Sequence, residues 1–242
     1  MPQTTQPRPQ APTWHQLAPR FAGERECMAA FLALETAEVL EGVKPANLIN
    51  LADRRQPCGR NLLRLWQRHG RSLLAASGLA WRELPGRRGS LLLLVYQVEA
   101  LTALLSRSAT QAVLTRAGYA NPADPEVSLK QLAQRLTQDG FPHEIGVFLG
   151  YPLKDVAAFL GWVELPFTGQ ALWRIYGKPE GSLALADRFR QSRCRMAQRL
   201  GSCAAVDCLR TGAGQGFFYA SNENDFQSQK GEIECASLSS AA

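Results

Sequence analysis

The sequence lacks the features that define several classes of protein. Its apolar runs are short, such as Leu91–Tyr96, whereas a helix needs about 20 apolar residues to span a bilayer. The six cysteines form no CxxC pair and no Cys/His finger, so we expect free reduced thiols and no metal site. The chain also begins without the charged and apolar segments of a secretory signal, which favours a cytoplasmic protein that does not enter the membrane.

The composition indicates a folded chain whose two ends differ from the rest. Hydrophobic residues make up 45% of the 242 residues and charged residues 20%, which is too apolar for a disordered protein. Residues 1–20 are rich in Pro and Gln, and residues 211–242 in Gly, Ser, Asn and Gln. We therefore predict a disordered leader over 1–20, a single domain over 21–210 and a flexible tail over 211–242.

Most of this domain has the apolar spacing of amphipathic helices. Helical patterns cover residues 24–41, 61–69, 72–80, 97–116, 128–137, 142–149, 152–160 and 182–200. Glycines stand where several of these helices should end, at Gly42, Gly70, Gly118 and Gly150. Apolar segments near 46–51, 91–96 and 172–176 favour strands, and the continuous apolarity of the second predicts burial on both faces. The predicted fold is α+β, a predominantly helical single domain with two or three short strands.

One segment resembles a known family. The stretch FPHEIGVFLGYPLKDVAAF, residues 141–159, resembles the signature of a bacterial family, domain-of-unknown-function family 3793. Three further segments resemble that family in the same order: EGVKPANLINL (41–51), SLLLLVYQVEALTALL (90–105) and WRIYGKPE (173–180). Members often carry a cysteine cluster before the tryptophan, but residues 166–177 contain no cysteine, so no metal or redox role carries over. The resemblance implies no established activity.

His143 and Glu144 lie at the start of the first helix of this motif. An imidazole beside a carboxylate can serve as a general base or a ligand, so both are candidate catalytic residues. The ordinary alternative is structural, with Glu144 complementing the helix dipole. No Ser-His-Asp order, HExxH motif or phosphate-binding loop accompanies them. The sequence therefore indicates no particular cofactor and leans against an enzyme.

A second group of residues is a candidate ligand site. Lys44 and Asn47 flank a proline at the start of a predicted strand, where an ammonium and an amide can hold an anionic group. Tyr96 and Tyr151 can add hydroxyl groups to the same pocket, although core packing is the ordinary role of such tyrosines.

The basic residues suggest possible partners. There are 27 Lys and Arg against 21 Asp and Glu, which gives a net charge of +6. Arg188, Arg195 and Arg199 recur along one predicted helix and are candidate contacts for an acidic protein partner, with a solvated helix face as the alternative. The corner at 142–160 has the cadence of a helix-turn-helix, but its second helix carries one Lys beside one Asp, which disfavours nucleic acid.

Three functions stay open at this point. The first is a cytoplasmic accessory or binding protein without catalysis. The second is a cofactor-handling protein or enzyme in iron, haem or flavodoxin-linked metabolism that uses His143 and Glu144. The third and minor one is a DNA-binding regulator. All three depend on whether the apolar side of the corner, namely Val156, Ala157 and Phe159, faces the interior.

Overall fold

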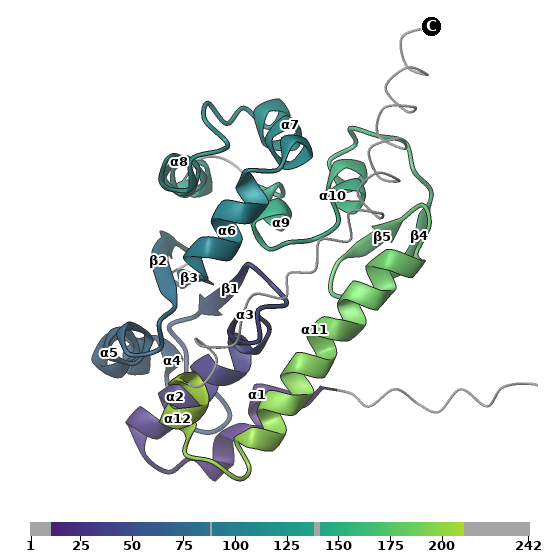
Figure 1. Cartoon of the computed structure of the whole chain (residues 1–242). Helices are drawn as coiled ribbons and strands as arrows, with labels where there is room; N and C mark the ends of the chain where they lie inside the picture. Colours follow the sequence, from purple (N-terminus) through teal and green to yellow (C-terminus); the bar gives the residue numbers. More distant parts are fainter. Residues whose placement is uncertain (1–10, 88, 138–140, 211–242) are drawn as a thin grey trace, which may run out of the picture.

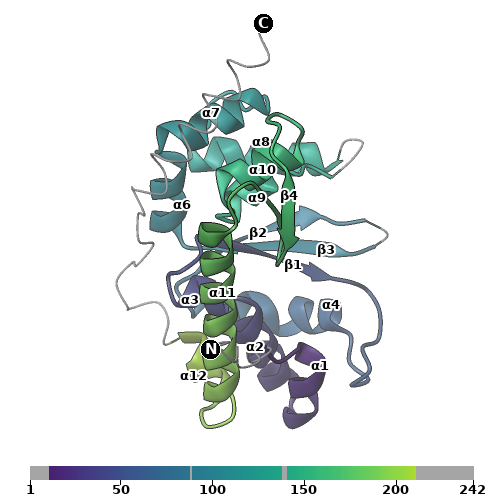
Figure 2. The same ribbon diagram turned by 90° about the vertical axis from the view of Figure 1, so that its right-hand side faces the viewer.

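A small antiparallel sheet lies between two layers of helices. The computed structural model describes residues 11–87, 89–137 and 141–210. The sheet has the strand order β1–β3–β2, and Figure 2 shows it between the layers. Its strands are β1 (Ala46–Leu51), β2 (Ala80–Pro85) and β3 (Leu91–Tyr96). A separate antiparallel hairpin consists of β4 (Phe167–Gln170) and β5 (Arg174–Tyr176). The predicted class, a mostly helical α+β fold, is confirmed.

The central strand β3 joins two hydrophobic cores. Successive side chains of a strand point to opposite faces. Leu93 and Val95 accordingly pack into the core of one layer, and Leu94 and Tyr96 into the core of the other. The expectation that this apolar run is a strand buried on both faces is confirmed.

The first layer lies below the sheet in Figure 2 and contains both ends of the described chain. Its helices are α1 (Trp14–Leu17), α2 (Glu24–Glu35), α3 (Ala37–Leu40), α4 (Leu62–Leu65), α5 (Arg71–Ala75) and α12 (Ala205–Arg210). The C-terminal helix α12 packs on α2, so the last described segment closes the core that the first one begins.

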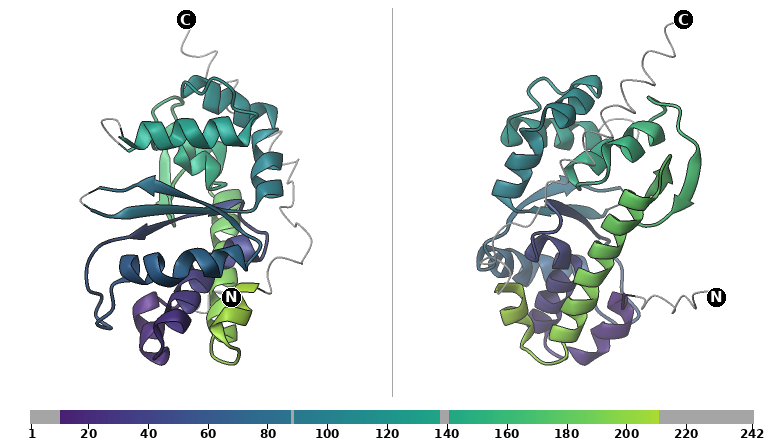
Figure 3. Two further views of the ribbon diagram at one scale, coloured as in Figure 1. Left: turned by 90° about the vertical axis from the view of Figure 1, so that its left-hand side faces the viewer. Right: turned by 45° about the vertical axis from the view of Figure 1, so that its right-hand side comes forward.

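The second layer covers the opposite face of the sheet (Figure 3). It contains α6 (Val98–Leu105), α7 (Ser108–Arg116), α8 (Pro125–Thr137), α9 (Ile145–Phe148) and α10 (Leu153–Phe159). The long helix α11 (Glu180–Arg199) starts beside the β4–β5 hairpin and runs along both layers to reach α2 and α3 (Figure 1). None of the helices in the described part of the chain is long and apolar enough to cross a bilayer.

The predicted leader needs correction. Residues 14–20 form α1 and a 3-10 turn, Ala18–Arg20, rather than a disordered segment. Trp14 and Leu17 are buried, and the Trp14 ring stacks on Phe21 with an edge-to-face contact to Phe31. Two well-spaced apolar side chains thus anchor a Pro-rich segment to the first layer. Residues 1–10 and the predicted tail at 211–242 lie outside the described residues.

Residues 61–85 also differ from prediction. Gly70 does not end the helix, because α4 continues through a π turn, Trp66–Gly70, into α5. The predicted helix at 72–80 therefore ends early, and Ala80–Pro85 forms the edge strand β2, which pairs with β3. The sequence predicts one strand near residues 172–176, which corresponds to β5. It does not predict β4, the strand with which β5 pairs.

Two long predicted helices are interrupted. Thr36 separates α2 from α3, and its hydroxyl donates a 2.7 Å hydrogen bond to the carbonyl of Leu32, a contact that competes with regular helix geometry. Residues 106–107 separate α6 from α7.

Candidate functional site

The corner between α9 and α10 forms one side of the candidate site. Gly150 adopts φ = 73°, a left-handed conformation that glycine reaches at little cost. The amide of Tyr151 donates to the carbonyl of Gly146, and that of Gly150 donates to Val147, both at 2.9 Å. This bonding pattern is the Schellman motif that closes a helix, and the following Pro152 precedes α10. A helix, a turn and a helix follow one another as predicted, but the first helix is shorter than the predicted 142–149, since α9 covers Ile145–Phe148.

The corner is mostly interior. Val156 is 5% exposed and Ala157 3%, as predicted, but Phe159 is 42% exposed. Gly146 lies so close to the corner that a Cβ there would stand 3.1 Å from both Tyr151 and Val156. The apolar side of α10 therefore divides: two residues face the core, and Phe159 faces an open cleft.

Asp155 fixes the second side of the site, the β4–β5 hairpin. Its buried carboxylate accepts hydrogen bonds from the Trp173 indole at 2.7 Å, the Ser182 hydroxyl at 2.6 Å and the Tyr176 amide at 2.9 Å. It also pairs with the ammonium group of Lys154 at 2.9 Å. Both carboxylate oxygens of Asp155 accept hydrogen bonds. The side chain therefore links α10 to β5 and α11 and holds the Trp173 ring in position.

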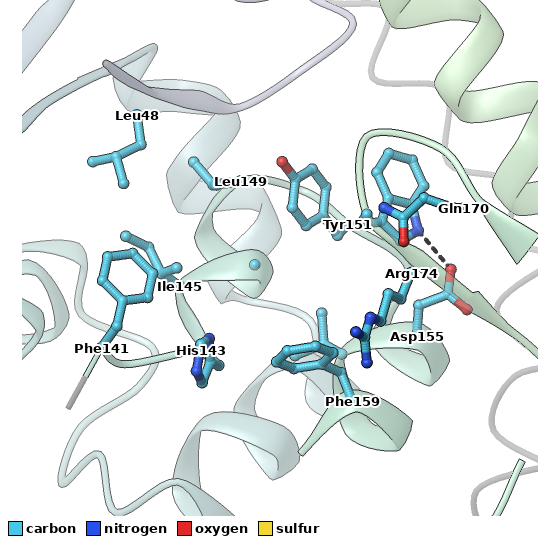
Figure 4. A pocket seen from close by; sticks show the side chains of 13 residues that line it. Leu48, Phe141, His143, Ile145, Leu149, Tyr151, Asp155, Phe159, Gln170 and Arg174 are labelled. Atoms are coloured by element: carbon cyan, nitrogen blue, oxygen red, sulfur yellow. Dashed lines mark hydrogen bonds between the residues drawn. The ribbon is translucent and has the colours of Figure 1, made fainter. Parts of the chain in front are cut away.

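Between the corner and the hairpin is a cleft of about 380 Å³. Its walls are mostly apolar and aromatic, and they come from β1, the corner and the hairpin: Leu48, Phe141, His143, Ile145, Gly146, Leu149, Tyr151, Asp155, Val156, Phe159, Gln170, Trp173 and Arg174. Figure 4 shows Tyr151 on one wall and Phe159 on the facing one. This size and this lining are typical of small-molecule sites.

The aromatic side chains support one another. Tyr151 and Trp173 stack with their ring centroids 4.6 Å apart. On the facing wall, the exposed imidazole of His143 meets Phe159 edge to face at 5.0 Å and approaches Phe141 at 5.7 Å. His143, a candidate from the sequence, therefore does line the cleft.

Glu144, the other catalytic candidate, points elsewhere. It is 3% exposed and accepts a 2.6 Å hydrogen bond from Arg135 and a 3.3 Å one from the Tyr119 hydroxyl. Burial and the neighbouring carboxylate raise the pKa of Tyr119, so that phenol stays protonated. His143 and Glu144 are adjacent in sequence but form no acid–base pair.

Three of the four predicted ligand-binding residues lie together: Tyr151 lines the cleft, and Lys44 and Asn47 lie behind it. Lys44 is 4% exposed and donates to Asn47 at 2.6 Å, and the Asn47 amide donates to the Glu35 carbonyl. The Lys44 ammonium lies 5.4 Å from the Tyr151 ring centroid. Burial lowers the pKa of Lys44 to about 8, against the opposing attraction of Glu38. Lys44 thus supports Tyr151 from behind, Asn47 holds Lys44, and neither lines the cleft.

Glu38 completes this buried group. Its side chain is 6% exposed, and one carboxylate oxygen, Oε2, accepts no hydrogen bond from the described residues. Burial raises the pKa of Glu38, and the Lys44 ammonium opposes that rise. Tyr96, the fourth ligand candidate, is 7% exposed in the core of the second layer and is not part of the cleft lining.

The arginines of α11 are partly engaged within the chain. Arg195 pairs with Glu41, and Arg193, which the sequence did not single out, pairs with Glu35. These pairs bind α11 to the first layer. A role for Arg188, Arg195 and Arg199 in contacting an acidic partner stays a prediction.

Although the corner has the pattern of a helix-turn-helix, α10 does not present a polar surface that could contact DNA bases. Residues 153–157 are all buried, and Lys154 donates to Asp155 and to the Tyr176 carbonyl. Among the described residues, no group of three His, Cys, Asp or Glu side chains could hold a metal ion.

Sequence reasoning missed Phe159 as a cleft residue and did not select Trp173 or Arg174. The guanidinium of Arg174 lies 5.8 Å above the Phe159 ring, and within the described chain it makes no hydrogen bond or ion pair. Its place in the WRIYG segment was the available signal, because that segment resembled the family.

Comparison with known proteins gives one match. A family model described as a protein of unknown function (DUF3793) matches residues 32–209. That span includes the corner, the hairpin and every residue that lines the cleft. No curated protein and no solved structure matches the chain.

Proposed function

We propose that the chain, which belongs to the DUF3793 family, is an accessory protein that binds a small molecule in the cleft and catalyses no reaction itself. The observation that carries the proposal is the cleft of about 380 Å³ with aromatic walls. A preformed pocket with aromatic walls and few polar groups is suited to binding, because apolar ligand surface is removed from water there.

The chemistry of the lining favours binding over catalysis. Glu144, which follows His143 in the sequence, and Asp155, the acid of the cleft lining, are both engaged in structural hydrogen bonds. A general acid or base must itself lie within hydrogen-bond reach of the substrate, and neither carboxylate is left free for that role. The described cysteines form no disulfide with one another, which supports the further proposal that the protein acts in the cytoplasm.

Ligand-induced thermal stabilisation tests this function. A library of metabolites and cofactors is screened against the wild type, and each ligand that raises Tm is tested on Phe159→Ala and His143→Ala. We expect both variants to lose most of the shift, because each removes part of a cleft wall. His69→Ala, an imidazole in the first layer, is the matched control and should keep it. Equal shifts in all four proteins would contradict the proposal.

A second candidate is a cofactor-handling protein or enzyme in iron, haem or flavodoxin-linked metabolism. What favours it is the exposed His143 imidazole in an aromatic cleft, since within the described residues that ring makes no hydrogen bond. The protein purified from its own host then carries a visible chromophore or bound iron, which His143→Ala loses. A colourless, iron-free wild type with full ligand response supports the first function instead.

A further inference from the structure

The cleft has two chemically different ends. Phe141, Ile145 and Leu149 form an apolar end, and Arg174 lies at the opposite end beside Phe159 (Figure 4). A ligand that fills the cleft therefore meets hydrocarbon at one end and a cation at the other.

The charges of the lining are not balanced within the protein. Asp155, its one acid, is neutralised by Lys154 and accepts three further hydrogen bonds. Arg174, in contrast, has a ring beneath it but no carboxylate beside it among the described residues. The fixed charge that the lining offers to a ligand is thus positive.

Arg174 is held in place by its neighbours. Trp173 is fixed through its hydrogen bond to Asp155, and Ile175 is fully buried, so the backbone of β5 is anchored on both sides. Contact with the face of Phe159 restricts the guanidinium further. Arg174 is exposed, and a guanidinium on such an anchored strand is well suited to bind a carboxylate, sulfonate or phosphate through paired hydrogen bonds.

From this arrangement we propose that the ligand is a small organic anion with a flat apolar body. The body lies between Tyr151 and Phe159, and the acidic group binds Arg174. The inference rests on the proposed binding function and adds the ligand class. A cleft of about 380 Å³ is at the lower end of the size range of small-molecule pockets, so the body consists of few rings.

Two fluorescent probes with one skeleton test the inference. The first is 8-anilino-1-naphthalenesulfonate, an aromatic anion, and the second is N-phenyl-1-naphthylamine, which lacks the sulfonate. Both become bright when they leave water. Affinities are measured for the wild type, Arg174→Gln and Arg116→Gln. The control suits the purpose because Arg116 is also exposed and lies 5.2 Å from a ring, that of Trp162, outside the cleft.

We expect Arg174→Gln to weaken binding of the anion by about tenfold, the typical size of a charge-assisted contact. The neutral probe should bind that variant as it binds the wild type, and Arg116→Gln should change neither affinity. An anion affinity that is unchanged in Arg174→Gln, or an equal loss for both probes, would overturn the inference.

Failure of the binding function gives a different result. If Phe159→Ala and His143→Ala bind both probes as tightly as the wild type, the probes do not use the cleft and the proposed function fails. If these two variants weaken both probes while Arg174→Gln weakens neither, the cleft binds small molecules and only the anionic ligand class is wrong. Absence of binding of either probe to the wild type overturns both proposals.

Discussion

At the scale of single residues, two buried ionic groups stabilise the site without taking part in it. Lys44 supports Tyr151 from behind, and Asp155 holds the indole of Trp173. Both are the kind of residue that sequence reasoning assigns to chemistry. Burial is what distinguishes them, since neither charged group is left free to meet a ligand.

Lys44 makes stability depend on pH. Its pKa is lowered to about 8 in the folded protein, so the unfolded chain binds more protons between about pH 8 and 10.5. The contribution of Lys44 to the free energy of unfolding therefore rises with pH across that window, by about 3 kcal/mol. Lys44→Met removes this contribution, and chemical denaturation of both proteins from pH 7 to 10.5 measures the difference.

The raised pKa values of cysteines and tyrosines act on both proteins alike and cancel in that difference. Lys130→Met, which changes an exposed lysine of α8, is the control and should give a flat difference. A flat difference for Lys44→Met as well would show that the buried ammonium does not titrate in this window.

Asp155 should be among the most costly residues to change. In Asp155→Asn the amide cannot accept all the hydrogen bonds of the carboxylate, and buried Lys154 loses its counter-charge. We expect a loss of about 3 kcal/mol or more in the free energy of unfolding. The control is Asp187→Asn, which breaks a more exposed pair with Arg190 and should cost less than about 1 kcal/mol. Equal losses for the two variants would contradict the role given to Asp155.

At the scale of elements, three of the four glycines predicted to end helices do so, because Gly42, Gly118 and Gly150 adopt positive φ just after α3, α7 and α9. Gly150 ends α9 as predicted, because a left-handed residue is needed there. Gly70 also follows a predicted helix, but the helix continues through it. Glycine is needed at this position because a side chain would collide with a neighbouring ring. A Cβ at Gly70 would lie 2.0 Å from the buried Trp66 ring. Sequence alone does not distinguish these two uses of glycine, because the second depends on a contact across the π turn.

Gly70→Ala tests that reading. The added methyl group must displace the indole of Trp66, which is fully buried and donates to Glu83. We expect a loss of at least about 2 kcal/mol in the free energy of unfolding. Gly169→Ala is the matched control, because a Cβ there meets no atom within 4 Å. A wild-type stability for Gly70→Ala would contradict the close packing of the π turn.

Strands were predictable where burial made them continuously apolar, as in β3, and missed where they lie at an edge. The edge strand β2 carries Arg82 and Glu83, whose polar side chains hide the strand pattern. The hairpin strand β4 is short and mostly exposed. Hydrophobic periodicity indicates which residues are buried. It therefore predicts exposed or edge strands less well than buried ones.

At the scale of the whole molecule, the cleft is a product of assembly. Its walls join Leu48 of β1, the corner at 141–159 and the hairpin residues 170–174. The sequence identified the corner and His143. It also predicted Glu144 as the partner of the imidazole, which is wrong, because Glu144 bonds to Arg135 and Tyr119. The contribution of the hairpin could not be foreseen, because only the fold brings residues 170–174 across from the corner.

The most direct measurement of the central claim, that this cleft is a small-molecule site, is a nuclear magnetic resonance titration of the ¹⁵N-labelled protein with 8-anilino-1-naphthalenesulfonate. The indole N–H signals of the tryptophans report separate parts of the fold. We predict that the Trp173 signal shifts and saturates, while those of Trp14 and Trp66 in the first layer stay in place. Shifts of Trp14 or Trp66 with an unmoved Trp173 would contradict the account.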